Sequence, residues 1–146
     1  MRRGRLPIPG LPKPLLPRLL PAVGPRRQAI RKGDKMTARL TSDFWVSAYL
    51  RRLEEAMIPA YVTARGDATA GAVVVKVATL DGAARAYERQ TDLMTGGRRW
   101  MLLAEGEERE VDAALARART RDPDLWLIEL EDRQGRTLLD QPGLAD

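Results

Sequence analysis

The chain has 146 residues, a formal net charge of +5, and neither cysteine nor histidine. Without cysteine it has no disulfide framework, thiolate zinc site, iron–sulfur cluster or cysteine nucleophile. Without histidine it has no imidazole to act as a general base near neutral pH or to ligate a transition metal. We therefore expect no cofactor, and any bound metal would have to be a hard cation held by carboxylates.

The positive charge is concentrated in residues 1–35. This segment holds 10 of the 25 lysines and arginines, 7 of the 10 prolines and a single acid, Asp34, which gives it a formal charge of +9. Residues 36–146 carry 15 bases and 19 acids, a formal charge of −4. The high isoelectric point thus belongs to the first segment and does not predict that the remainder binds nucleic acid.

Frequent proline predicts that residues 1–35 are disordered. Three interpretations compete: a basic arm for nucleic acid or an anionic surface, a targeting leader, or sequence upstream of the true start. We favour the third, because the preference for arginine over lysine after Met36, 14 to 1, indicates a GC-rich gene whose upstream sequence would have this composition. We expect Met36 to be the initiator and residues 36–146 to form a single domain.

No segment approaches the ~20 consecutive apolar residues that a membrane-spanning helix needs. Prolines also interrupt every candidate signal-peptide core near the N-terminus. We therefore expect a cytoplasmic protein without a membrane partner.

The first element predicted after Met36 is a helix over residues 43–57. Apolar residues recur there at helical spacing, Ser42 is placed to cap the helix, and Pro59 follows its end. Alternating and β-branched segments separated by turn signals then predict four strands, over residues 60–65, 72–80, 84–91 and 98–104.

The four strands are expected to form a meander. Asp81 and Gly82 predict a two-residue hairpin turn, since a primed turn needs positive φ at both central residues. Acids at residues 107–112 and arginines at residues 117–121 then predict a second helix, oriented as the helix dipole favours.

The last firm strand is predicted over residues 125–131, followed by a short extended segment at residues 137–139. Trp126, Ile128 and Leu130 alternate along this strand and are expected to point inward. The resulting order, αββββαβ, predicts an α+β fold in which two helices pack on one face of a mainly antiparallel sheet.

Four segments carry a resemblance to a known family: LTSDFWVSAYLRRLEEA, GDATAGAVVVKVATLDG, GGRRWMLLAEGE and RDPDLWLIELEDRQGR. They resemble a family of small bacterial proteins, the domain of unknown function 1491, over about residues 37–140. The resemblance implies a compact α+β domain that begins close to Met36. It implies no activity, because the family has no established substrate, cofactor or catalytic residues.

One cluster is a candidate site for an anion or a partner, because arginines beside an aromatic ring can bind a phosphate, a carboxylate or an unstacked base. Its members are Arg85, Arg89, Arg98, Arg99 and Trp100. We favour a simpler interpretation, in which the guanidinium groups pair with Glu129, Glu131 or Asp132 across the sheet and Trp100 fills the core.

Acids around the last strand raise a second candidate, a magnesium-dependent nuclease. Nuclease folds of similar element order hold the metal with an acid and an acid-x-Lys motif on successive strands. Here the only lysine after Met36 is Lys76, and Val74 stands two residues before it, so we disfavour a nuclease. We read Glu129 and Glu131 as the solvated face of a strand.

The sequence thus predicts a fold without naming a function. Our leading hypothesis is a small cytoplasmic interaction or accessory domain without catalysis, whose partner is an unidentified protein or a second copy bound at a sheet edge. Two alternatives stay open. One is a binder of nucleic acid or an anionic ligand through the arginine and tryptophan cluster, and the other is an enzyme that uses carboxylates alone.

Overall fold

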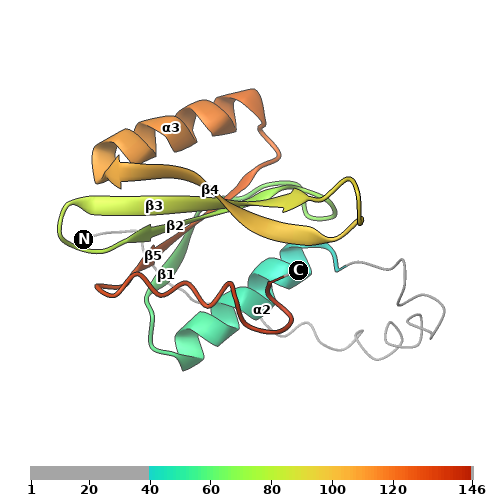
Figure 1. Ribbon diagram of the computed structural model, residues 1–146, viewed down its shortest axis with the longest axis horizontal. Coiled ribbons are helices and arrows are strands. Elements are labelled where there is room, and N and C mark those ends of the chain that lie inside the picture. Colours follow the sequence, from blue (N-terminus) through green and yellow to red (C-terminus); the bar gives the residue numbers. More distant parts are fainter. Residues whose placement is uncertain (1–39, 146) are drawn as a thin grey trace. The chain divides into compact units, whose positions relative to one another are not determined.

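The structure, a computed structural model, describes residues 40–145, so the expectations for residues 1–35 and for Met36 lie outside the described residues. The predicted order αββββαβ and the α+β class are confirmed (Figure 1). The elements are α2 (Ser42–Glu55), β1 (Ala60–Ala64), β2 (Val73–Ala78), β3 (Ala83–Thr91), β4 (Arg98–Glu107), α3 (Glu108–Arg121) and β5 (Trp126–Glu131). Neither described helix is long and apolar enough to cross a bilayer.

The strands form one five-stranded sheet in the order β1-β5-β2-β3-β4. β2, β3 and β4 make the expected antiparallel meander, but β1 does not join it. β5 lies between β1 and β2, antiparallel to β1 and parallel to β2. The expected four-strand meander is wrong at β1 because α3 is long enough to return the chain across the sheet, and a parallel neighbour requires such a crossover.

The two helices cover opposite faces of the sheet, as Figure 1 shows, which corrects the expectation that both lie on one face. α2 packs with Val73, Val75 and Val77, whereas α3 packs with Val74 on the other side of β2. Every residue of β2 is buried. A strand that is apolar on both faces needs a cover on each, and this requirement places one helix on either side.

Helix α2 begins at Ser42, one residue earlier than predicted, and Ser42 is not its cap. The Ser42 hydroxyl donates to the Gly71 carbonyl at 2.6 Å and is buried. The backbone N–H groups of Ser42 and Asp43 donate to the carbonyls of Thr69 and Ala68. Carbonyl groups of the loop before β2 therefore satisfy the open end of the helix in place of a capping side chain.

The turn between β2 and β3 also differs from the prediction. The Thr79 N–H donates to the Ala83 carbonyl at 3.1 Å, so three residues lie between them. Leu80 and Gly82 adopt positive φ, 64° and 94°, while Asp81 does not. Asp81 instead accepts hydrogen bonds from the Thr79 hydroxyl and the Ala83 N–H, which fixes the longer turn.

Residues 132–145 contain no strand, contrary to the expectation for residues 137–139. Their contribution is to the core, since Leu139 and Leu144 are buried beside α2. The Tyr49 hydroxyl donates to the Thr137 carbonyl at 2.8 Å, and the Trp100 indole N–H donates to the Leu144 carbonyl at 2.9 Å. The last described residues thus close one side of the α2 core.

Gly66 gives a direct test of how closely the loop before β2 approaches β5. A Cβ atom there would lie 2.1 Å from the carbonyl oxygen of Asp124, so the backbone must move to admit any side chain. We expect Gly66→Ala to lower the free energy of unfolding by about 2–3 kcal/mol, measured by urea denaturation. Gly97→Ala, whose Cβ would meet only the Thr95 hydroxyl at 3.4 Å, should change it little, and equal effects would contradict the argument.

Candidate functional site

A buried lysine lies at the centre of the sheet. Lys76 on β2 is 3% exposed, and its Nζ donates to three carboxylates. The distances are 2.7 Å to Glu108 Oε2 and 2.6 Å to Asp112 Oδ1, and the third bond is to Glu129 Oε2. An ammonium group has three N–H donors, and here all three have an acidic acceptor.

Two elements bring these carboxylates to Lys76. Glu129 is its direct neighbour in the parallel pairing of β2 with β5. Glu108 and Asp112 are four residues apart on α3, so they share one face of the helix. Val111 and Leu115 of α3 are buried against the same side of the sheet, which holds that face toward Lys76.

Lys76 and its three carboxylate partners carry a formal charge of −2, and Lys76 stays protonated. Burial by itself would lower the pKa of Lys76, but the hydrogen bonds that its ammonium donates to Asp112, Glu108 and Glu129 outweigh it and raise the pKa above its ordinary value. A nucleophilic or basic lysine needs a lowered pKa. Lys76 is therefore a cation at neutral pH that holds α3 and β5 to β2.

The same carboxylates are the one group within residues 40–145 with the spacing of a metal site. One oxygen each from Glu108, Asp112 and Glu129 lie within 4.8 Å of one another, as the ligands of a hard cation would. The Lys76 ammonium is hydrogen-bonded to all three and supplies the positive charge that such an ion would bring. The arrangement is thus an ion cluster in which Lys76 offsets part of the negative charge of the three carboxylates.

Sequence reasoning missed this cluster. The sequence predicts that Glu129 is a solvated acid or a partner for the arginines, but its partner in the structure is Lys76. The available signal was a lysine within VVVKVA, because a charge in a strand buried on both faces needs partners. Acids spaced by four residues at the start of the following helix were the matching signal.

The arginine and tryptophan cluster is divided between the two faces of the sheet. Trp100 packs against the core on the α2 side, and Arg98, two residues earlier on β4, shares that face. Arg85 and Arg89 lie on the same side of β3 as Tyr87, which also packs against the α2 core. Arg99 points to the opposite face, so four of the five predicted residues share one face of the sheet, and of these Arg89 lies against Trp100.

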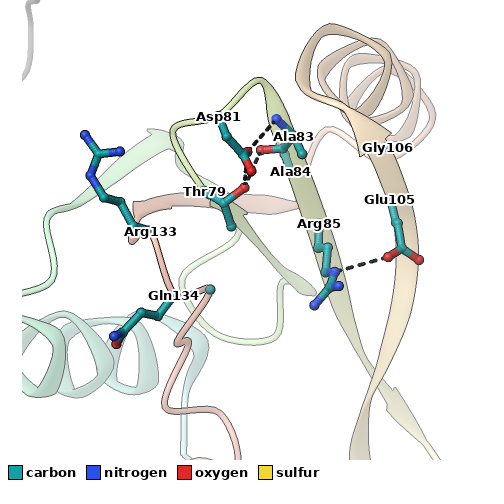
Figure 2. A pocket seen from close by; sticks show the side chains of 10 residues that line it. Thr79, Asp81, Ala83, Ala84, Arg85, Glu105, Gly106, Arg133 and Gln134 are labelled. Carbon is teal, nitrogen blue, oxygen red and sulfur yellow. Dashed lines mark hydrogen bonds and ion pairs between the residues drawn. The ribbon is translucent and has the colours of Figure 1, made fainter.

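The contacts of Arg85 and Arg89 lie on β4 and on the aromatic core. Arg85 Nε donates to Glu105 on β4 at 3.1 Å (Figure 2), and the Arg89 guanidinium lies over the rings of Trp45 and Trp100, at 4.8 and 5.7 Å from the ring centroids. The partner of Arg85 is therefore an acid of the neighbouring strand and not one of the acids expected at the last strand. Trp100 is only half-buried, so it packs against the core from its edge.

Asp132, the third acid expected to pair across the sheet, is instead bound within its own turn. Its carboxylate accepts from the Arg136 guanidinium at 2.7 Å and from the Arg136 backbone N–H, also at 2.7 Å. These bonds hold the pKa of Asp132 below its ordinary value, the hydrogen bond from the Arg136 side chain being the largest cause. The pair closes the turn that follows β5.

A shallow depression of about 380 Å³ lies at the β2–β3 turn (Figure 2). Its charged lining consists of Arg85, Arg133, Asp81 and Glu105, two of each sign. Hydrogen bonds from the Thr79 hydroxyl and the Ala83 N–H hold the pKa of Asp81 below its ordinary value. The balanced charge and the existing Arg85 to Glu105 pair leave no net preference for an anion.

The fold and these side chains define a five-stranded α+β domain with a helix on each face and a buried lysine paired with three carboxylates at its centre. This class of protein has solved relatives. The family described as Protein of unknown function (DUF1491) matches residues 40–140, and the chain belongs to this family. No curated protein matches.

Three solved structures are similar to this chain. The crystal structure of a DUF1491 family protein from Caulobacter crescentus CB15 is 42% identical, covers 71% of this chain and 98% of its own, and has a TM-score of 0.65. An NMR structure of a DUF1491 family protein from the same organism is 43% identical, with 70% and 94% covered and a TM-score of 0.62. The solution structure of protein Atu0922 from A. tumefaciens is 35% identical, with 72% and 98% covered and a TM-score of 0.57.

The Lys76 cluster predicts a large effect of removing the ammonium. Lys76→Met leaves three carboxylates close together without a counter-charge, and breaking a buried ion cluster in this way is costly. Because the acids are 28–53% exposed, we discount the cost to about 2 kcal/mol of the free energy of unfolding at pH 7. Chemical denaturation measures it, with Arg117→Met on the exposed side of α3 as the control.

The same comparison has an expected pH dependence. A raised pKa means that the folded state holds the Lys76 proton more tightly than the unfolded state, whose lysine titrates near 10.5. The stabilisation by Lys76 is therefore fully present below pH ~10.5 and is lost as the pH rises through the folded-state value. The difference between the wild type and Lys76→Met should stay constant from pH 7 to ~9.5 and shrink in stronger alkali; a difference that grows in alkali would contradict this assignment.

Proposed function

We propose that this chain is a cytoplasmic, non-catalytic interaction domain that binds protein by strand addition at β4. The observation that carries the proposal is the length, edge position and exposed apolar centre of this strand. β4 is ten residues long, lies at the edge of the sheet, and has three consecutive exposed apolar residues at its middle. Met101, Leu102 and Leu103 are 37%, 50% and 40% exposed.

Edge strands of soluble proteins are usually short, twisted away, or interrupted by charges at their middle, because unpaired backbone groups recruit other strands. β1, the other edge, has only five residues and is mostly half-buried. β4 has the length and apolar centre that β1 lacks, and this contrast supports β4 as the recognition edge. Strand addition draws its affinity from main-chain hydrogen bonds and its specificity from the alternating side chains.

The central polar cluster supports a non-catalytic role. Lys76 is saturated with acceptors and has a raised pKa, so it offers neither a free base nor a nucleophile. Among the residues that the structure describes, the buried side-chain polar atom left without a hydrogen bond is Trp45 Nε1, a weak basis for chemistry. Indole N–H is a donor only and does not titrate.

A charge at the middle of the edge tests the proposal. The full chain is used to capture partners from native cells, each partner is purified, and binding is measured again with pure components. We expect Leu103→Lys to weaken binding at least tenfold, because it places a charge where the incoming strand must pack. Phe44→Lys, at a 58% exposed apolar residue of α2, is the matched control and should bind as the wild type does.

Two results would count against this function. One is a purified partner whose affinity is the same for the wild type and for Leu103→Lys. The other is turnover in a broad hydrolase or transferase screen that Glu129→Gln abolishes, which would favour the enzyme that uses carboxylates alone.

A second candidate function is binding of nucleic acid or an anionic ligand through the arginine face. It is supported by Arg85, Arg89, Arg98 and Trp100 lying on one side of the sheet. We expect that, if this face binds, Arg98→Gln with Arg89→Gln in the full chain weakens binding of a labelled single-stranded oligonucleotide and lowers its salt dependence. Unchanged binding by the double variant would end this candidate, since residues 1–35 carry the same charge in both proteins.

A further inference from the structure

β4 carries opposite charges at its two ends. The strand reads RRWMLLAEGE, so Arg98 and Arg99 begin it, Glu105 and Glu107 end it, and the apolar residues lie between. The exposed edge is therefore basic at one end, apolar at the centre and acidic at the other end. A partner strand that matches it must have the reverse order of charge.

The strand itself has that order when it is turned around. We propose, building on the proposed function, that the partner of β4 is β4 of a second copy, paired antiparallel about a two-fold axis near Leu102 and Leu103. This pairing sets Arg98 of one copy opposite Glu107 of the second copy, and the reverse pair follows by symmetry. Parallel pairing would set like charges side by side, so the charge pattern selects the antiparallel arrangement.

The register within the sheet places the two ends of this pair on the same face. Arg98 is paired with Thr91 and Glu107 with Ala83. Thr91 and Ala83 are an even number of positions apart on β3, which has no extra residue, so they point to one side of the sheet, as do their partners. Arg98 and Glu107 can therefore meet across the new interface without crossing the strand.

A bulge lies at the centre of the proposed interface. The pairing passes from Leu102 opposite Tyr87 to Ala104 opposite Ala86, which leaves Leu103 as the extra residue of β4. A bulge interrupts regular hydrogen bonding and increases the local twist. Pairing between copies is therefore expected over the two segments that flank the bulge, with the leucines of both copies packed together at the axis.

Glu107, at the acidic end of β4, stays exposed beside its intramolecular partner. Glu107 is 3.8 Å from Arg109, and the side chains are 66% and 90% exposed, so this contact is weak. Two short strand segments bury less surface than a standard interface, so we expect a dissociation constant on the order of 10 µM. The dimer is thus a concentration-dependent one.

The absence of cysteine from the chain allows a direct test of the axis. Leu103→Cys in the full chain places two thiols within reach of each other only if identical residues meet near a two-fold axis. We expect rapid disulfide-linked dimer under mild oxidation at ~50 µM, measured on non-reducing gels. Met94→Cys, 92% exposed on the β3–β4 turn and far from the axis, is the control and should cross-link slowly; equal rates overturn the proposal.

Charge exchange tests the orientation by sedimentation velocity. Arg98→Glu and Glu107→Arg should each weaken the dimer roughly tenfold, since each creates two like-charge contacts, and the double variant should recover it. A wild type that stays monomeric up to several hundred µM overturns the self-pairing. If the wild type is monomeric but Leu103→Lys abolishes binding of a different purified protein, strand addition at β4 stands and only the self-pairing is wrong. If Leu103→Lys leaves that binding unchanged as well, both the proposed function and the self-pairing are wrong.

Discussion

The fold depends on how the buried ammonium group of Lys76 finds hydrogen-bond acceptors away from water. Lys76 lies in a strand whose six residues are all buried, and removing such a charge from water is tolerated only when every donor finds an acceptor. The three acceptors come from β5 and from the first turns of α3, elements more than 30 positions away in the chain. Satisfying one side chain therefore fixes the crossover helix, the parallel neighbour of β2 and their mutual register.

The rest of the architecture follows from β2 being covered on both sides. Val73, Val75 and Val77 require α2, while Val74 and Lys76 require α3. With both faces of the central strands occupied by helices, the remaining routes to another molecule are the edges and the exposed faces of the outer strands. The burial of β2 at the centre and the exposure of β4 at the edge thus result from the same arrangement of two helices on one sheet.

Much of the fold could be predicted from the sequence, because local periodicity reports local structure. The alternation of Trp126, Ile128 and Leu130 identified β5 and its inward face, and the acids and arginines of α3 identified the helix and its direction. The predictions that failed concern contacts between distant segments of the chain. The place of β5 beside β2, the assignment of the helices to opposite faces and the contacts of Lys76 all depend on pairings between distant segments, which periodicity does not encode. The turn at Leu80 failed for a different reason, since a leucine at φ 64° has no signature in composition.

The contacts at the end of the described chain bear on when the protein can fold during synthesis. Tyr49 bonds to Thr137, and Arg52 bonds to Gln141 and Pro142, at sequence separations of 88 to 90 residues. Leu144, the last of the core side chains, is buried beside α2 and accepts a hydrogen bond from Trp100. The ribosome delivers α2 before these partners, and non-local contacts form late because their loops must close. The apolar face of α2 therefore has no complete cover until residues 137–144 have left the exit tunnel, and the core closes only then.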